Sequence, residues 1–276
     1  MGFDREDLPM KQTIASILAL LIGGAGLVHA DMLGNPGMQV GVKNLFVGIE
    51  YSTAVQTLDF DTTELDLTTE RANLKVTTGL KNWFDIYLKV GGASLMQDYE
   101  NNSYSYRSLG YAISNYDSDM NVGFGGGGRL RLYNNVDTGL RLFVQGGGYY
   151  CTTEGEISWQ KDALTTFTKD RETTWADVYV GAGIAKRMDF VDLQLGFGAS
   201  QVRWVINDVD IEQVGNSVSR VTQPERDSWE STNPLFGFIG IDFVLPHEYR
   251  LSAQAGIRSV ENYEFSIAIS QGLERD

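Results

Sequence analysis

Residues 74–91 read LKVTTGLKNWFDIYLKVG, and this stretch decides the fold. On each side of Trp83, apolar or neutral residues alternate with polar, charged or glycine residues. The first set is Leu74, Val76, Thr78, Leu80, Phe84, Ile86, Leu88 and Val90, and the second is Lys75, Thr77, Gly79, Asp85, Tyr87, Lys89 and Gly91. Successive side chains of a β-strand point to opposite faces, so this period of two predicts a pair of strands, each with one apolar and one polar face.

The same alternation returns along the rest of the chain, whereas helical periodicity is hard to find anywhere. It predicts ten strands, at residues 44–58, 71–82, 84–97, 120–133, 138–151, 175–187, 190–205, 235–245, 249–259 and 263–273. Each segment is near or above the ~9–11 residues with which a tilted strand crosses a membrane.

The links between these segments alternate in length. Short links follow the second, fourth, sixth and eighth segments, whereas long polar links occupy residues 59–70, 98–119, 152–174 and 206–234. This alternation is typical of up-and-down barrels in the bacterial outer membrane, which have short periplasmic turns and long outer loops. The sequence therefore predicts an all-β, antiparallel up-and-down transmembrane β-barrel of about ten strands, with eight or twelve as the alternatives.

Charge is distributed in the way that such a barrel requires. The chain carries 22 basic and 36 acidic residues, and this acidity argues against a nucleic-acid partner. The long links, with Arg71 included, together carry the whole net charge of residues 31–276. Within the strands, a charge facing lipid costs roughly 2–4 kcal/mol at mid-bilayer, so charged residues are expected to face the lumen. Those predicted to line it are Lys75, Asp85, Lys89, Arg129, Arg131, Arg141, Asp242 and Arg258, all on the non-apolar parity.

The N-terminus is predicted to be a targeting segment. An apolar run from Ile14 to Val28 follows Lys11, and small residues precede Asp31, which is the pattern of a secretory signal peptide. We therefore expect residues 1–30 to be a cleaved leader and residues 31–276 to form one barrel domain in the bacterial outer membrane. A signal peptide starts with basic residues, whereas the residues before Met10 are acidic. Met10 is therefore an alternative to Met1 as the start of translation.

Aromatic residues gather at both ends of the predicted strands, where a barrel wall meets lipid headgroups. Examples are Trp83 and Tyr249 beside the short turns, and Tyr150, Trp175 and Trp204 near the long links. With this architecture, residues 31–276 resemble the small outer-membrane β-barrel proteins of Gram-negative bacteria, in the broad sense of the OmpA- and Opa-like barrels. The resemblance implies outer-membrane lipids, lipopolysaccharide and the barrel-assembly machinery as partners. The chain departs from that family at its C-terminus, which is not aromatic.

No catalytic or cofactor constellation accompanies the barrel pattern. Of the two histidines, His29 leaves with the leader and His247 lies in a predicted periplasmic turn, so histidine-dependent catalysis at the cell surface is not expected. A GxGxxG string at residues 123–128 runs on in strand period without a following helix, which argues against dinucleotide binding. The single cysteine, Cys151, permits no internal disulfide. The sequence predicts a protein that is not an enzyme and has no organic cofactor.

The long links contain acidic residues two positions apart, which point to one face of an extended chain. These candidate ligands for Ca²⁺ or Mg²⁺ are Asp59, Asp61, Asp117, Asp119, Asp208, Asp210 and Glu212. Both ions prefer several hard oxygen ligands, and lipopolysaccharide phosphates could supply some of them. The alternative is that these acids only solvate surface loops.

Three functions remain open from the sequence. The first is a non-enzymatic surface protein with a mostly closed lumen and acidic extracellular loops, because about eight strands already enclose an interior that side chains fill. The second is a narrow porin-like channel for small anionic solutes with a basic lumen. The third is a secreted, soluble, lipocalin-like barrel. The oligomeric state is not predicted.

Overall fold

The computed structural model of the chain describes residues 44–60, 63–97, 112–113, 116–160, 165–214, 217–221, 225–230, 235–258 and 262–273. The predicted leader, residues 1–30, lies outside the described residues. Among those residues, no helix is long and apolar enough to cross a membrane.

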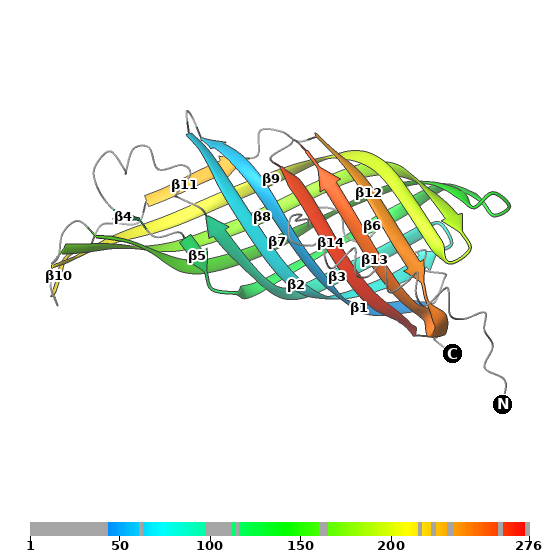
Figure 1. The fold of residues 1–276 in the computed structure, drawn as a ribbon, viewed down its shortest axis with the longest axis horizontal. Helices are drawn as coiled ribbons and strands as arrows, with labels where there is room; N and C mark the ends of the chain where they lie inside the picture. Colours follow the sequence, from blue (N-terminus) through cyan, green and yellow to red (C-terminus); the bar gives the residue numbers. More distant parts are fainter. Residues whose placement is uncertain are drawn as a thin grey trace, which may run out of the picture.

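Ten antiparallel strands form a closed ring in the described part of the chain (Figure 1). They are β1 (Leu45–Phe60), β2 (Thr63–Lys81), β3 (Phe84–Gln97), β6 (Asn121–Asn135), β7 (Leu140–Gln160), β8 (Thr165–Met188), β9 (Val191–Val214), β12 (Leu235–Val244), β13 (Tyr249–Ile257) and β14 (Tyr263–Leu273). Each strand pairs with the next, and β14 pairs with β1 from Leu45↔Leu273 to Val55↔Tyr263. The predicted ten-stranded barrel is therefore confirmed, and the alternatives of eight and twelve strands are wrong.

Four short strands continue this pairing beyond the ring. They are β4 (Ala112–Ile113), β5 (Tyr116–Ser118), β10 (Ser217–Val221) and β11 (Glu225–Glu230). β5 pairs with both β3 and β7, whereas β10 and β11 pair with the outer part of β9. At the opposite end, the short 3-10 helix η1 (Pro246–Glu248) connects β12 to β13.

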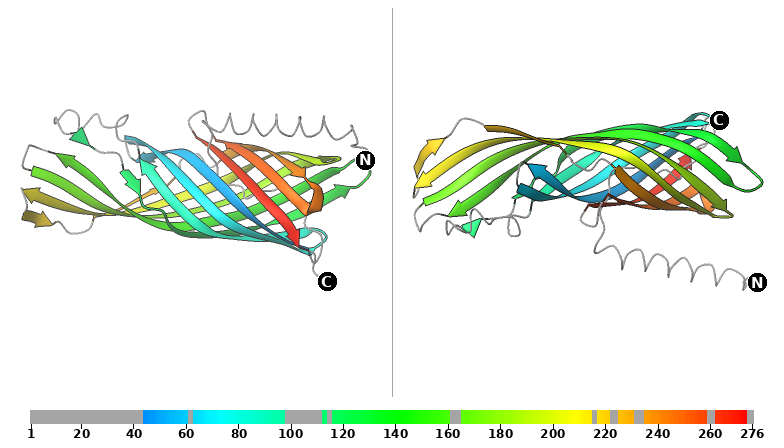
Figure 2. Two further views of the ribbon diagram at one scale, coloured as in Figure 1. Left: turned by 60° about the horizontal axis from the view of Figure 1, so that its bottom comes forward. Right: turned by 90° about the horizontal axis from the view of Figure 1, so that it is seen from above.

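The outer parts of β7, β8 and β9 form an extension that continues far beyond the ring (Figures 1 and 2). β8 and β9 each have 24 residues, or roughly 80 Å of extended chain, whereas ~9–11 residues are enough to cross a membrane. The predicted loops at 59–70, 152–174 and 206–234 are therefore wrong over most of their length. They looked like loops because a strand in water has no lipid-facing side, so it shows no outward apolar parity.

Within the ring, the two faces of each strand differ as the alternation requires. Outward side chains are apolar and exposed, as at Leu88, Val122 and Phe197, which are 68%, 72% and 71% exposed. Inward side chains are buried, and many of them are charged or polar. A continuous apolar surface with polar groups enclosed inside is the arrangement that a lipid bilayer favours.

The aromatic residues do not all lie where the sequence predicts. Trp83, Phe190 and Tyr249 are exposed beside the short turns, and Tyr150 packs outside against Phe124. Trp175 and Trp204 were expected in the outer girdle, but both are fully buried inside the barrel and contact each other edge to face. They belong to the inward parity of β8 and β9, which continue past this level instead of ending there.

Candidate functional site in the barrel lumen and the outer groove

One carboxylate and two lysines meet in the middle of the lumen. Glu50 Oε2 lies 2.7 Å from Lys75 Nζ, and Glu50 Oε1 lies 3.1 Å from Lys89 Nζ. Lys75 and Lys89 are direct partners on β2 and β3, so without Glu50 the register would place two like charges side by side. All three side chains are buried, and each oxygen of Glu50 accepts one charge-assisted hydrogen bond.

Towards the outer end, a second charge pair is enclosed by aromatic rings. Arg71 NH1 donates to Asp177 Oδ2 at 3.1 Å, and the guanidinium lies 4.3 Å from the Tyr149 ring and 4.9 Å from the Trp175 ring. Trp175 Nε1 donates to the same carboxylate oxygen at 3.3 Å. Aromatic faces attract a cation most strongly where water is excluded, so the two rings add to the ion pair in holding the Arg71 guanidinium.

A third cluster lies towards the short turns. Its polar contacts are an ion pair between Arg141 and Asp192, an ion pair between Arg131 and Asp85 with an N–O distance of 3.7 Å, and a 2.5 Å hydrogen bond from Gln194 Nε2 to Asp242 Oδ2. Arg129 donates to Gln145 and lies over the Phe143 ring. The three clusters together place acids against bases along the length of the lumen.

Glycines on β6 and β7 make room for two tyrosines from β3 and β8. A Cβ atom added at Gly127 or at Gly147 would lie 2.5 Å from Tyr87 Oη. The Tyr87 and Tyr179 hydroxyls share a 2.5 Å hydrogen bond over the glycines of β6 and β7. The glycine-rich run thus serves packing, because large rings fill the volume that small residues leave.

The residues predicted to line the lumen all lie on inward positions of the ring or beside its outer rim. Lys75, Asp85, Lys89, Arg141 and Asp242 are buried, and Arg129, Arg131 and Arg258 are partly exposed. Sequence reasoning did not identify Arg71 and Asp177 as a pair, although both share the inward parity. It also gave no signal that Glu50 would contact both lysines, because the three residues lie on three neighbouring strands whose register the sequence does not specify.

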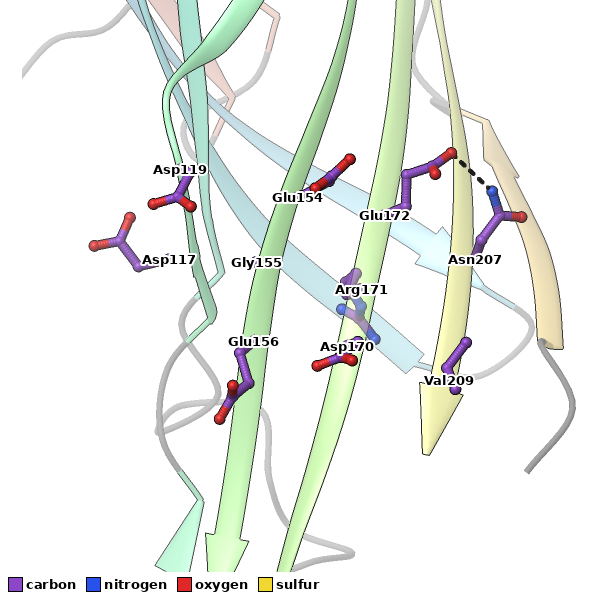
Figure 3. A pocket seen from close by; sticks show the side chains of 10 residues that line it. All are labelled: Asp117, Asp119, Glu154, Gly155, Glu156, Asp170, Arg171, Glu172, Asn207 and Val209. Atoms are coloured by element: carbon purple, nitrogen blue, oxygen red, sulfur yellow. Dashed lines mark hydrogen bonds between the residues drawn. The ribbon is translucent and has the colours of Figure 1, made fainter. Parts of the chain in front are cut away.

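On the outside of the extension, acidic side chains from β5, β7 and β8 line a groove of about 800 Å³ (Figure 3). Its acids are Asp117, Asp119, Glu154, Glu156, Asp170 and Glu172. One basic residue, Arg171, also lines it and donates to Gln97 Oε1 at 2.6 Å. Asn207 Nδ2 donates to Glu172 Oε1 at 3.2 Å, which is the dashed contact in Figure 3.

The predicted metal ligands are only partly described. Asp117 and Asp119 are exposed at the groove, and Asp61 lies outside the described residues. Asp59 lies in β1, and Asp208, Asp210 and Glu212 lie in β9, but the structure does not describe their side chains. Where side chains are described, no three Asp, Glu, His or Cys residues converge closely enough to hold a metal ion.

Comparison with solved structures shows the fold. The chain is similar to the translocator domain of the autotransporter NalP from Neisseria meningitidis, with 11% identity, a TM-score of 0.50 and 98% of each chain covered. It is also similar to the outer membrane protease OmpT from Escherichia coli, with 9% identity, a TM-score of 0.44, and 86% of this chain and 97% of that chain covered. No protein-family model matches the chain, and no curated protein matches its sequence. The fold is that of an outer-membrane β-barrel.

Proposed function

We propose that this protein is a non-enzymatic barrel of the bacterial outer membrane, with a lumen closed to solutes and an acidic extension on the cell surface. The exposed apolar side chains around the ring support the membrane location. They also argue against the alternative of a soluble, lipocalin-like barrel, because soluble monomers rarely expose a large continuous apolar surface.

The observation that carries the closed lumen is the pairing of its charges. Glu50 bridges Lys75 and Lys89, and Arg71 and Arg141 each contact a buried aspartate. A channel for anionic solutes would leave basic groups available to the solute, whereas here carboxylates of the barrel itself occupy them. Opening such a path would separate buried ion pairs, which costs several kcal/mol for each pair.

The non-enzymatic role rests on the chemistry of the described residues. The one histidine among them is His247, which is exposed in the turn formed by η1, at the opposite end from the extension. Cys151 is buried, so its thiol has no access to a substrate. The acids of the outer groove lie beside no described histidine or cysteine that would work with them as a nucleophile or base.

The acidic groove supports a second part of the proposal, an interaction with divalent cations shared with lipopolysaccharide. Exposed carboxylates attract Ca²⁺ or Mg²⁺, but these ions take six or more oxygen ligands. Because the described acids do not converge in threes, phosphate oxygens of neighbouring lipopolysaccharide would complete the coordination.

Liposome swelling tests the closed lumen. Refolded residues 31–276 would be reconstituted into liposomes, and a general porin in separate liposomes would be the positive control. Swelling would be followed in isosmotic glucose and in gluconate. We expect vesicles that contain this protein to swell at the same rate as protein-free vesicles in both solutes. Faster swelling in gluconate alone would establish the anion channel instead.

Calorimetry tests the cation proposal. Millimolar Mg²⁺ would be titrated into the protein in detergent with and without lipopolysaccharide, and the groove variant Glu154→Gln/Glu156→Gln would serve as the comparison. We expect heat that requires lipopolysaccharide and falls in the variant, whereas identical titrations for both proteins would overturn it.

A further inference from the structure

The wall formed by β12, β13, β14 and β1 contains buried polar atoms that have no hydrogen-bond partner among the described residues. They include both amide atoms of Gln254, Oε1 of Glu264, and the hydroxyl of Ser52. Each of these side chains is at most 4% exposed. An unsatisfied buried polar group costs roughly 1–3 kcal/mol, so several on one wall require a common explanation.

The strand register joins these groups into a column. Gln254 pairs with Ser266, and Ser266 pairs with Ser52 on the next strand. Glu264 lies two residues from Ser266 on the same face of β14, towards the outer end. Inward residues that are direct or diagonal partners on neighbouring strands lie about 5–8 Å apart, which is the spacing that one hydrogen-bonded molecule can bridge.

The column continues towards the short turns through β12 and β9. Gly240 pairs with Gln254 on one side and with Gln194 on the other. Gln194 uses its amide nitrogen to bind Asp242, but its Oε1 has no partner among the described residues. The polar atoms therefore run from Glu264, near the outer end, to Asp242 in the inner cluster.

Gly240 also shows that this wall has room. A Cβ atom added there would meet nothing nearer than 3.6 Å, although the residue is buried. At Gly127 and Gly147, on the other side of the ring, the same addition would lie 2.5 Å from the Tyr87 hydroxyl. Large rings fill the volume above the glycines on that side, whereas a methyl group at Gly240 would make only ordinary contacts, with Gln254 and Gln194 among them.

We propose that this column, from Glu264 through Gln254 to Gln194, binds a file of water molecules and lets water, but not solutes, cross the barrel. Water is the ligand that fits, because it both donates and accepts hydrogen bonds. The unpartnered atoms include both donors and acceptors, and each lies near other unpartnered polar atoms. Charged groups of both signs surround Glu264, namely Arg258, Asp177, Arg71 and Lys89. An ion of either sign would be repelled by some of these groups and retained by others, so we expect ions not to pass. The inference goes beyond the closed lumen proposed above, because that proposal concerns solutes and says nothing of the passage of water.

The test is osmotic water permeability of vesicles that contain the refolded protein, measured by stopped-flow light scattering. We expect permeability above that of protein-free vesicles for the wild type. Gly240→Leu places an apolar side chain in the column, and we expect it to return permeability to the protein-free level. Thr77→Val, a buried change on β2 outside the column, is the matched control and is expected to match the wild type.

Heat-modifiable migration on a denaturing gel would verify that each variant has folded. If Gly240→Leu does not fold, Gln254→Leu removes both amide atoms at nearly constant volume and carries the same expectation. Wild-type permeability equal to that of protein-free vesicles would overturn the water file, as would wild-type permeability in both folded variants. Solute swelling of the same vesicles is a separate readout, so failure of the closed lumen is distinguishable from failure of the water file.

Discussion

Two sides of one barrel fill the lumen with different side chains. On the side of β3, β6, β7 and β8, glycine positions receive tyrosine rings, and a Cβ atom at Gly127 would lie 2.5 Å from Tyr87 Oη. On the side of β12, β13, β14 and β1, Phe236 and Phe238 face the lumen at the outer end, but the residues around Gln254 are small or polar, and a Cβ atom at Gly240 would meet no atom nearer than 3.6 Å. The same residue type thus serves dense packing on one side and leaves space on the other.

The difference shows that the lumen of this barrel is not packed in the same way around its whole circumference. Rings and ion pairs fill the lumen where the large side chains originate, whereas the unpartnered amide of Gln254 lies among small or polar partners, Gly240 and Ser266. Changes on the packed side should therefore cost stability, and equivalent changes on the polar side should be tolerated.

The largest expected effect follows from removing the central carboxylate. Glu50→Ala leaves Lys75 and Lys89 buried side by side without the group that both contact, and removing one partner of a buried ion pair costs about 3–5 kcal/mol. Urea unfolding in detergent, followed by tryptophan fluorescence, would measure the loss. The triple variant Glu50→Ala/Lys75→Met/Lys89→Met should recover most of it, and failure to recover would contradict the electrostatic cause.

A glycine substitution on each side tests the comparison directly. Gly127→Val should lower the free energy of unfolding by about 1–3 kcal/mol, because both a tyrosine hydroxyl and backbone atoms oppose the new side chain. Gly240→Ala should change the free energy of unfolding by less than about 0.5 kcal/mol, because its methyl group makes only ordinary contacts. Equal losses in the same urea titration would show that the two sides are packed alike.

The tyrosine pair should make a smaller contribution. Tyr87→Phe leaves the Tyr179 hydroxyl without its 2.5 Å partner, and we expect a loss of about 1 kcal/mol. Tyr87→Phe/Tyr179→Phe should cost less than the sum of the single changes, because no buried hydroxyl then lacks its partner. A double-mutant cycle would measure the coupling, and strict additivity would mean that the hydroxyls do not interact.

The smallest effect is expected on the extension. Glu172→Gln keeps a group that can accept the hydrogen bond from Asn207, and the site is exposed, so we expect a change in stability within about 0.5 kcal/mol. Thermal unfolding of the variant beside the wild type would measure it. A loss comparable to that of Glu50→Ala would mean that the extension, and not the lumen, controls stability.

Much of the ring could be predicted from sequence because the bilayer imposes a period of two on every spanning strand. The alternation from Leu74 to Val90 marks two strands and their turn without any knowledge of their partners. The extension could not be predicted in this way, since residues 165–174 and 206–214 continue beyond the ring, where a strand needs no apolar outer face. Polarity there reflects the solvent and not the absence of a strand.

The lumen was predictable as a set of residues but not as a set of contacts. Parity places Lys75, Lys89 and Asp242 on the inward face, yet the partner of each depends on strand register and tilt, which sequence alone does not specify. Gln254 and Glu264 share that parity and drew no attention, because a polar residue on an inward position is ordinary. They stand out only once the register shows that Oε1 of Glu264 and both amide atoms of Gln254 have no hydrogen-bond partner among the described residues.

Single-channel conductance in a planar bilayer tests the closed lumen most directly. The refolded protein would be recorded at high and low salt, with folding and insertion verified on the same preparation. The paired charges and packed rings predict no steady conductance steps. Steady, anion-selective steps that weaken when Arg129 and Arg131 are neutralised would contradict the account and establish a narrow anion pore.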